Sequence, residues 1–402
     1  MGALFEAAKA ADASCVMQTY ARKPVMFVRG EGMRLFDDEG KEYLDFVAGI
    51  GAVNLGHAHP AVTAAVAEQA SKLVHVSNLY YVEHRAELAC DVVRLMGGGM
   101  RVFFANSGAE ANEGAIKLAR RWASEAKPGA HVIVTAERSF HGRTLATLAA
   151  TGQSAKQSPF APLPAGFVHV PLNDIGALDE ALDETVAALM LEVVQGEGGV
   201  WLADAEYLAA AQKLCRERSV LLIFDEVQTG FFRTGPAFAH QAFGLSPDIV
   251  TIAKAMANGL PIGGLVATEE VAAAFRPGDH GSTFGGGPVV CAAGRATIKA
   301  MEAASLGENS AACGTYLRDQ LSALAERSGA ITEVRGAGLM AGCSLAEPVA
   351  VAAAAGLLER GAVVNHIGTN ILRFLPPLVC GTAEIDTLVG MLSNTLEEVA
   401  RS

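Results

Sequence analysis

Two side chains, an acid and a lysine, each follow an apolar run and could together do chemistry on a carbonyl compound. Residues 220–224 form a short apolar run that ends in Asp225, and residues 249–253 form a second run that ends in Lys254. Such runs are typical of strands buried on both faces, and open α/β sheets bind ligands beyond the carboxyl ends of their strands. A buried lysine presents a free amine that condenses with an aldehyde. With a carboxylate facing a ring nitrogen, this pair predicts a cofactor such as pyridoxal phosphate.

Both residues also have ordinary explanations. A lone lysine after a strand is commonly a solvated surface residue, and a strand that ends in Asp-Glu also resembles the metal-binding acid of a P-loop ATPase. That ATPase requires G-x-x-x-x-G-K-[ST], whereas the only Gly-Lys pair here, Gly40-Lys41, is followed by Glu42. The cofactor hypothesis in turn requires a phosphate cradle, an aromatic stack and a substrate anchor elsewhere in the chain.

A strand-to-helix turn supplies a candidate phosphate cradle. A strand is predicted at residues 101–105, and a helix with one apolar face is predicted to end near residue 126. Between them, Ser107 and Glu110 form a capping box, which alone would mark only the start of a helix. The turn also leaves N–H groups free at the positive end of the helix, where Gly108 lets a phosphate approach closely.

Strands and helices alternate around these motifs, which predicts a mostly parallel sheet between helix layers. The predicted elements are a hairpin at 34–46, helices at 61–72, 83–96 and 288–304, strands at 131–135 and 186–194, and a smaller α/β unit after 305. A partial dinucleotide fingerprint at 336–341 continues into a strand and is discounted. His57 and His59 lack a third ligand of suitable spacing, so no metal site is expected.

The composition favours a large globular chain from a reducing compartment. Its 402 residues are 51% hydrophobic and 18% charged, enough for a sizeable core. The net charge of −12, without a basic block, argues against nucleic acid or an anionic membrane as a partner. Seven widely spaced cysteines without C-x-x-C, and no secretory signal or membrane-spanning run, predict a cytoplasmic protein.

Taken together, six motifs in order resemble the class III aminotransferases. They are NSGAEANEGAIKLAR (106–120), SFHGRTLATL (139–148), QGEGG (195–199), FDEVQTGFFRTG (224–235), IAKAMANGLPIGG (252–264) and HGSTFGGGP (280–288). The resemblance implies the fold type I scaffold of pyridoxal-phosphate transferases, with a large mostly parallel-sheet domain and a smaller α/β domain. It places an N-terminal segment at 1–75 that packs with the small domain, the large cofactor domain at 76–286 and the small domain at 287–402. It also implies a homodimer with shared active sites.

Within this family, the length and the RFLPP stretch at 373–377 are most similar to the acetylornithine aminotransferases. The resemblance implies transfer of the distal amine of N-acetylornithine to 2-oxoglutarate, in arginine biosynthesis. Succinylornithine, ornithine, 4-aminobutyrate and carrier-bound lysine remain alternative donors, and a regulator that binds the cofactor without turnover remains an alternative of another class. Ala109 stands where the family often has Thr, and Val193 where it often has Pro; neither change removes a required group.

The resemblance further implies roles for individual residues. Lys254 would bind the cofactor's aldehyde and move the proton, while Asp225 would hold the ring nitrogen. The implied cofactor contacts are the backbone of Ser107, Gly108 and Ala109, the ring-stacking Phe140 and Val227, Gln228 at the ring hydroxyl, Glu226 beside it, and Thr283 from the neighbouring subunit. The implied substrate contacts are Arg143 and Arg373 for carboxylates, Ser282, and Glu197, which covers Arg373 when the distal amine reacts.

Overall fold

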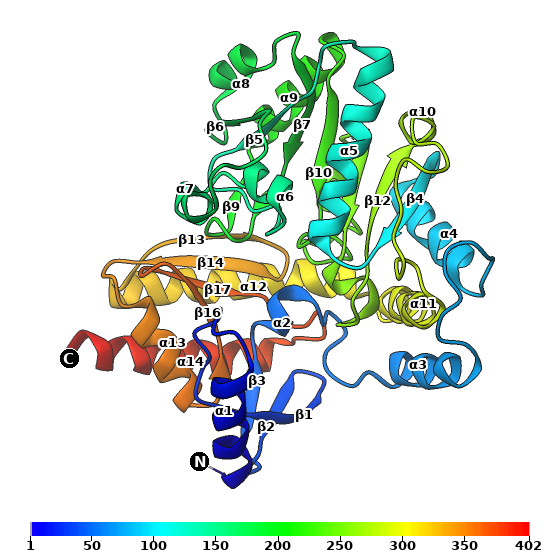
Figure 1. Cartoon of the computed structure of the whole chain (residues 1–402). Coiled ribbons are helices and arrows are strands. Elements are labelled where there is room, and N and C mark those ends of the chain that lie inside the picture. Colours follow the sequence, from blue (N-terminus) through cyan, green and yellow to red (C-terminus); the bar gives the residue numbers. More distant parts are fainter. Residues whose placement is uncertain (1, 402) are drawn as a thin grey trace.

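A seven-stranded sheet forms the centre of the larger part of the molecule (Figure 1). The computed structural model describes residues 2–401. Across the sheet the strands are β4 (Met100–Ala105), β12 (Gly263–Thr268), β11 (Ile249–Ile252), β10 (Leu221–Asp225), β7 (Val186–Leu191), β5 (Val132–Ala136) and β6 (Phe167–Val170). Strands β6, β5, β7, β10 and β11 pair in parallel, whereas β12 is antiparallel to β11 and β4. The predicted mostly parallel α/β sheet is confirmed.

Helices cover both faces of this sheet. They are α4 (Arg85–Met96), α5 (Gly108–Ala126), α6 (Leu145–Ala150), α7 (Ser154–Gln157), α8 (Ile175–Ala181), α9 (Ala205–Glu217) and α10 (Glu269–Ala272), with the short 3₁₀ segments η1 (Ser158–Phe160), η2 (Ala239–Phe243) and η3 (Lys254–Ala257). Successive side chains of a strand point to opposite faces. Leu221 and Ile223 of β10 therefore pack with α5, while Leu222 and Phe224 pack with α8 and α9. This two-sided burial explains the continuous apolar runs.

The two ends of the chain build the rest of the molecule together. The N-terminal elements are α1 (Ala3–Cys15), β1 (Phe27–Glu31), β2 (Arg34–Asp37), β3 (Glu42–Asp45), α2 (Ala48–Gly51) and α3 (Pro60–Lys72). The C-terminal elements are α11 (Pro288–Ala303), α12 (Leu306–Ser328), β13 (Ile331–Ala337), β14 (Met340–Leu345), α13 (Ala350–Glu359), β15 (Ala362–Val363), β16 (Asn365–Ile367), β17 (Ile371–Phe374) and α14 (Thr382–Arg401). Strand β15 pairs in parallel with β3, so one sheet joins both ends of the sequence.

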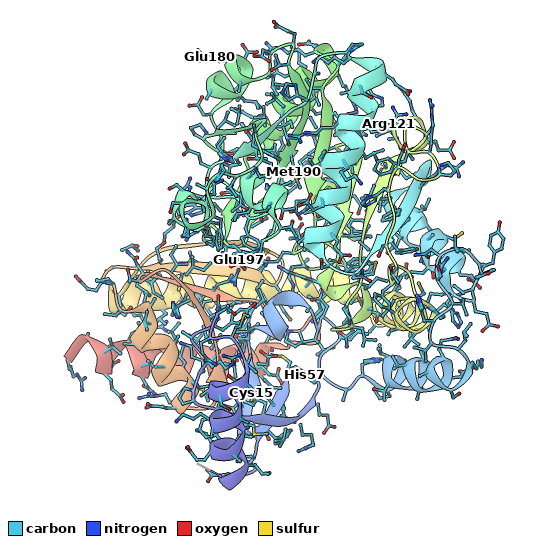
Figure 2. All side chains as sticks on the ribbon, viewed as in Figure 1. Cys15, His57, Arg121, Glu180, Met190 and Glu197 are labelled. Carbon is cyan, nitrogen blue, oxygen red and sulfur yellow. The ribbon has the colours of Figure 1, made fainter. Side chains whose placement is uncertain are left out.

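The two parts meet beside a loop that carries Glu197. In Figure 2, Met190 of β7 lies inside the large unit, and Glu197 lies where this unit approaches the C-terminal sheet β13-β14-β17-β16. Within residues 2–401, no helix has the length and apolar composition needed to cross a membrane.

Most predicted elements are present, with local differences. The strand predicted at 186–194 stops at Leu191, and the chain resumes as β8 (Val194–Gln195), which pairs with β9 (Trp201–Leu202). The interruption places Glu192 directly after the carboxyl end of β7, a central strand of the sheet. The discounted stretch at 336–341 spans the turn of the β13–β14 hairpin, and His57 forms a pair with Asp45, 2.8 Å from Nε2 to Oδ2.

Candidate functional site

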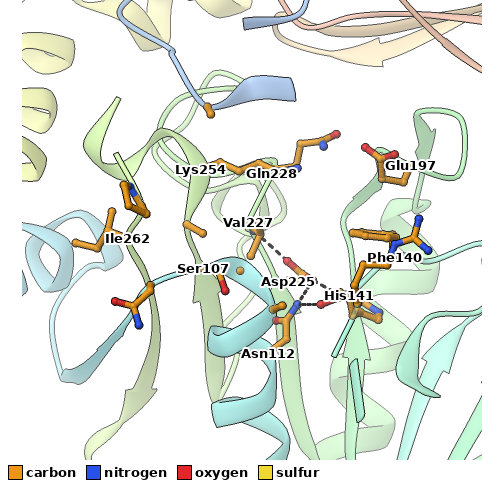
Figure 3. A pocket seen from close by; sticks show the side chains of 18 of the residues that line it. Ser107, Asn112, Phe140, His141, Glu197, Asp225, Val227, Gln228, Lys254 and Ile262 are labelled. Atoms are coloured by element: carbon orange, nitrogen blue, oxygen red, sulfur yellow. Dashed lines mark hydrogen bonds and ion pairs between the residues drawn. The ribbon is translucent and has the colours of Figure 1, made fainter. Parts of the chain in front are cut away.

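A cavity of about 410 Å³ lies beyond the carboxyl ends of the parallel strands. Its walls come from the turn before α5, the loop after β5, and the ends of β7, β10 and β11 (Figure 3). Ten of the residues singled out by the sequence line this cavity: Ser107, Gly108, Ala109, Phe140, Arg143, Glu197, Asp225, Val227, Gln228 and Lys254. Residues that are distant in sequence therefore share one hollow, at the sheet edge where α/β proteins bind ligands.

Lys254 enters the cavity from the end of β11. Its backbone has φ = 38°, in the left-handed region that ordinary residues avoid and that functional sites use. Burial lowers the pKa of Lys254 to about 8; Arg373 adds to this effect, while Glu197 and Asp225 oppose it. Near neutral pH, Lys254 is therefore a free amine far more often than an ordinary lysine with a pKa of 10.5.

Asp225 ends β10 and is held by three donors. Its Oδ2 accepts from Asn112 Nδ2 at 2.8 Å and lies 2.8 Å from His141 Nδ1, and its Oδ1 accepts from the Val227 N–H at 3.0 Å. The opposite ring nitrogen of His141, Nε2, is buried without a hydrogen-bond partner among the described residues. A hydrogen on Nδ1, directed at Oδ2 of Asp225, satisfies this arrangement. Such donors favour the ionised form of a carboxyl group.

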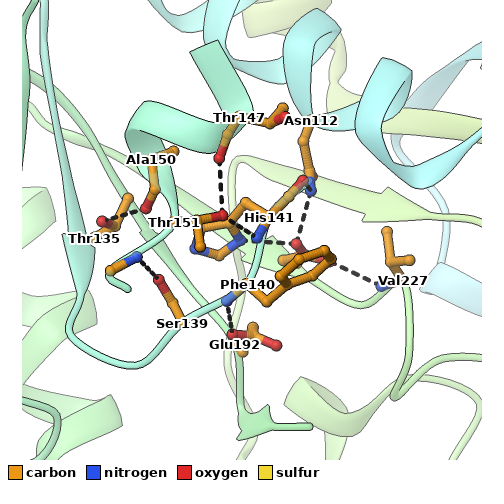
Figure 4. Close-up of polar contacts among 12 residues, drawn as sticks. Asn112, Thr135, Ser139, Phe140, His141, Thr147, Ala150, Thr151, Glu192 and Val227 are labelled. Carbon is orange, nitrogen blue, oxygen red and sulfur yellow. Dashed lines mark hydrogen bonds and ion pairs between the residues drawn. The ribbon is translucent and has the colours of Figure 1, made fainter. Parts of the chain in front are cut away.

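The loop that carries His141 and Phe140 is tied to the elements around it (Figure 4). The His141 N–H donates to Thr151 Oγ1 at 2.9 Å, and Thr151 Oγ1 donates to the Thr147 carbonyl at 2.9 Å. The Phe140 N–H donates to Glu192 Oε2 at 3.0 Å. These bonds fix the backbone on both sides of the Phe140 ring, which lines the cavity.

The start of α5 forms a cradle without room for a side chain. Ser107 Oγ accepts from the Glu110 N–H at 3.1 Å, and the Glu110 carboxylate accepts from the Asn106 N–H at 2.8 Å. A Cβ added to Gly108 would lie 2.7 Å from Val227 Cγ1. The first N–H groups of a helix lack intrahelical acceptors, so this end of α5 can bind an anion at the cavity wall.

Of the charged residues predicted to bind substrate, Glu197 and Arg143 line the cavity, whereas Arg373 lies on β17 outside the lining and bonds to Glu197. Arg373 Nη1 donates to Glu197 Oε1 at 2.5 Å and to the Gly196 carbonyl at 3.0 Å, and Nη2 donates to Asn365 Oδ1 at 2.8 Å. Burial raises the pKa of Glu197, but Arg373 and Lys254 outweigh it, and the pKa lies below its ordinary value. Arg143 is exposed, and its guanidinium carbon lies 5.6 Å from the Phe140 ring centre.

The structure places the remaining predicted residues elsewhere. Glu226 is fully buried and does not line the cavity: its carboxylate accepts from the backbone N–H groups of Ala239 and His240, at 2.9 and 2.8 Å. Ser282 and Thr283 line a separate surface hollow. Within this chain they therefore do not reach the cavity.

Eleven lining residues were not among the predicted set, and three of these, Asn112, His141 and Glu192, bond to Asp225 or to the Phe140 N–H. Only Glu192 carried a usable signal, because it ends the apolar run 186–191 as Asp225 ends its own run. Asn112 and His141 act through Asp225, a contact between segments 84 to 113 residues apart, which sequence spacing does not reveal.

Comparisons with known proteins agree on one family. The family described as "Aminotransferase class-III" matches residues 16–396. A relative from Caldanaerobacter subterraneus subsp. tengcongensis, named acetylornithine aminotransferase, is 49% identical over 385 residues, covering 96% of this chain and 98% of the relative. The acetylornithine aminotransferase structure from Elizabethkingia anophelis has a TM-score of 0.88 at 34% identity, covering 98% of this chain and 99% of that one. An ornithine aminotransferase from Toxoplasma gondii, described with partial occupancy of PLP at its active site, has a TM-score of 0.94 at 33% identity, covering 98% and 95%.

Proposed function

This chain belongs to the class III aminotransferases, and from that premise we propose that it moves the distal amine of N-acetylornithine to 2-oxoglutarate. The products are N-acetylglutamate semialdehyde and glutamate, a step of arginine biosynthesis in the cytoplasm. The observation that carries a distal-amine preference is that the buried Arg373 is covered by Glu197 while Arg143 stays open. The choice of donor rests on the relatives named acetylornithine aminotransferase.

The enzyme is a pyridoxal-phosphate-dependent transaminase, as its family is, and the cavity fits that cofactor. The start of α5 offers an anion cradle that a Cβ at Gly108 would fill, and Gln228 Oε1 is a buried acceptor without a partner among the described residues. We assign the phosphate to this cradle, the aldehyde to Lys254, the ring nitrogen to Asp225 and the ring hydroxyl to Gln228. When bound, the cofactor withdraws electrons from the carbon that carries the transferred amine.

Each catalytic side chain then has one task. Lys254 would take the proton from the substrate carbon that carries the amine and deliver it to the cofactor carbon that came from the aldehyde, and its pKa of about 8 suits both transfers near neutral pH. Asp225 keeps a proton on the ring nitrogen, because Asn112, His141 and the Val227 N–H hold its carboxylate in place. Phe140 and Val227 would cover the two faces of the ring.

Two arginines would serve two substrates of different shape in a ping-pong cycle. In the first half, Arg143 binds the donor's α-carboxylate, and Glu197 keeps Arg373 from attracting it. In the second half, Glu197 moves away, so that Arg373 binds the α-carboxylate of 2-oxoglutarate and Arg143 binds the distal one. Arginine suits both places because it grips carboxylates through two parallel hydrogen bonds.

A substrate panel tests this proposal. Purified enzyme is given 2-oxoglutarate with N-acetylornithine, succinylornithine, ornithine, 4-aminobutyrate or carrier-bound lysine, and glutamate formation is followed by a coupled assay. We expect N-acetylornithine to have the highest kcat/KM. A higher kcat/KM for another donor would identify that donor as the substrate. If no donor yields glutamate, the result supports the non-catalytic regulator instead.

We also propose that the enzyme is a homodimer. Leu79, Tyr80, Tyr81 and Phe284 are large apolar side chains that are mostly exposed, and Asn78 Nδ2 joins their two segments by donating to the Ser282 carbonyl at 2.7 Å. Contiguous exposed apolar side chains mark interaction surfaces. A partner seated there would meet Ser282 and Thr283, which we propose contact the partner's bound phosphate and substrate.

A further inference from the structure

A second carboxyl group stands beside Asp225 at the cavity floor. Glu192 follows β7, which pairs in parallel with β10, with Leu191 opposite Phe224. The next residues along the two strands are therefore Glu192 and Asp225, and both line the cavity. Glu192 is 6% exposed and Asp225 is 5% exposed. Water therefore screens the repulsion between two negative charges at this place only weakly.

The hydrogen bonds of these two carboxyl groups differ. Asp225 has three donors, whereas Glu192 has one, the Phe140 N–H, within the described part of the chain. Carboxylates that accept several hydrogen bonds favour ionisation, and two buried carboxyl groups at one site do not ionise together readily. The pattern of donors therefore assigns the negative charge to Asp225.

We propose that Glu192 is a neutral carboxylic acid in the folded enzyme and acts as a positioning residue for the Phe140 loop. Its oxygen holds the Phe140 N–H, and its proton leaves Asp225 as the single negative charge at these two strand ends. The consequence for catalysis, that the charge of Asp225 is available to the ring nitrogen, rests on the proposed function. The protonation state of Glu192 does not depend on that function.

The surrounding groups support this assignment. Burial and the charge of Asp225 raise the pKa of Glu192 well above its ordinary value; the Phe140 N–H and Lys254 oppose the rise, and Glu197 adds to it. Besides Asp225 on β10, the charged groups that line the cavity are Lys254 after β11, Glu197 after β8 and Arg143 after β5. Burial lowers the pKa of Lys254 itself, so this lysine opposes the rise at Glu192 less than an ordinary lysine would.

Urea unfolding of the cofactor-free protein across pH tests the proposal directly. An acid with a raised folded pKa binds its proton in the folded state but loses it on unfolding, so its stability contribution falls as pH rises between the two pKa values. Glu192→Gln keeps the acceptor oxygen and removes this titration. We expect the unfolding equilibrium constant of the wild type, relative to Glu192→Gln, to rise with pH above the ordinary range of a carboxyl pKa, by up to about tenfold per pH unit. Asp225→Asn should shorten the pH range over which this ratio rises, because it removes the neighbouring charge that helps to raise the pKa of Glu192.

Activity and infrared spectra give independent readouts. Glu192→Ala should lower kcat/KM at least tenfold, and Glu192→Gln should recover most of that loss, because Gln restores the bond to the Phe140 N–H. Cofactor-free wild type near neutral pH should show the carbonyl band of a protonated carboxyl group, which persists in Asp225→Asn and is lost in Glu192→Gln. The proposal is wrong if the ratio of the two unfolding constants does not change with pH. It is also wrong if the wild type lacks that carbonyl band. The second test needs only the wild type, so it holds even if Glu192→Gln folds poorly. A positive slope without transamination would leave the neutral acid in place and refute only the proposed function.

Discussion

Lys254 combines a strained backbone with a weakened charge. A left-handed conformation costs a non-glycine residue roughly 1–3 kcal/mol, and the φ of 38° follows directly from a buried strand, where the chain turns into η3. Burial then lowers the side chain's pKa to about 8. Both features reduce the stability of the cofactor-free protein and favour an amine that reacts.

The first prediction concerns the pH dependence of that amine. The folded pKa lies below the ordinary value of 10.5, so the folded protein binds fewer protons than the unfolded chain between these values. The cofactor-free protein should therefore gain stability as pH rises from about 8 to about 10.5, and Lys254→Met should lose this gain.

Capture of pyridoxal phosphate by Lys254, followed by absorbance, should accelerate with a midpoint near pH 8. Borohydride reduction and peptide mapping should find the label on Lys254; Lys156→Ala, at another lysine whose pKa burial lowers, should leave the label in place. A label on a different lysine contradicts the assignment.

Asp225 and Glu226 are adjacent carboxylates with opposite predicted effects. Asp225 faces the cavity, where we propose that it pairs with the ring nitrogen of the cofactor. A shift of one unit in the pKa of that nitrogen is worth about 1.4 kcal/mol. We expect Asp225→Asn to lower kcat about a hundredfold or more, with a change in unfolding free energy below about 1.5 kcal/mol. Glu226 ties the turn after β10 to η2, so Glu226→Gln should cost about 2–4 kcal/mol of stability and far less rate per folded molecule. Kinetics paired with urea titrations separate the two; equal losses of rate in both variants would contradict the division.

At the scale of elements, the turn from β4 into α5 depends on one missing side chain. Gly108 has Val227 directly against it, with 2.7 Å from an added Cβ to Cγ1. Gly108→Ala should therefore push the start of α5 away from the loop after β10, weaken binding of pyridoxal phosphate tenfold or more, and be partly rescued by Val227→Ala. Fluorescence titration of the cofactor-free variants measures this coupling. The matched control is Gly390→Ala in α14, where a Cβ meets open space and should add about 0.5–1 kcal/mol of stability. Strictly additive effects of the two substitutions on affinity would show that this contact is not what fixes the cradle.

The sequence was informative where a segment's own pattern decides its structure. Runs such as 220–224 and 249–253 predicted buried strands because both faces are covered by helices, and the acid and lysine at their ends marked the cavity. The pattern failed where long-range contacts decide. Glu192 interrupts the strand predicted to residue 194 because its side chain turns into the cavity. The pairing of β15 with β3 joins segments more than 300 residues apart, and no local signal announces it.

At the scale of the whole molecule, one buried cation ties three regions together. Arg233 is fully buried in the loop after β10 and donates to the Leu339 carbonyl at 2.9 Å, to the Pro376 carbonyl and to Asn54. Burial lowers its pKa to about 9, a cost that the surrounding oxygen acceptors offset. Because Arg233 belongs to the large domain at 76–286 and its contacts reach both chain ends, we propose that it holds the segments 1–75 and 287–402 in place against that domain.

The pair of Arg373 and Glu197 spans the same boundary, since β17 carries the arginine and a loop of the large unit carries the glutamate. An exposed ion pair is worth about 0–1 kcal/mol, whereas this guanidinium is 1% exposed and also bonds Asn365 and the Gly196 carbonyl. These two bonds hold Arg373 in place when Glu197 leaves. We expect Glu197→Ala to raise reaction at α-amines and to lower the preference for distal amines at least tenfold, and Arg143→Ala to slow both half-reactions. Single-turnover kinetics on each half measures this; an unchanged preference in Glu197→Ala would assign the gate to another group.

The last prediction concerns sites shared between two subunits. Thr283 is exposed and outside its own chain's cavity, so if it completes the partner's site, two inactive variants should complement each other. Lys254→Ala and Thr283→Glu each leave a homodimer without a complete site, the second by placing a negative charge against the phosphate. After random exchange of equal amounts, half of the dimers are hybrids with one complete site each, and activity should return to about a quarter of the wild type. The matched control puts both changes on one chain and mixes it with wild type: shared sites leave about a quarter of the activity, and unshared sites about a half. Light scattering should first establish the dimer, and exchange is followed with differently tagged chains. No recovery in the first mixture together with half activity in the second, once exchange is complete, would show that each site is built from one chain alone.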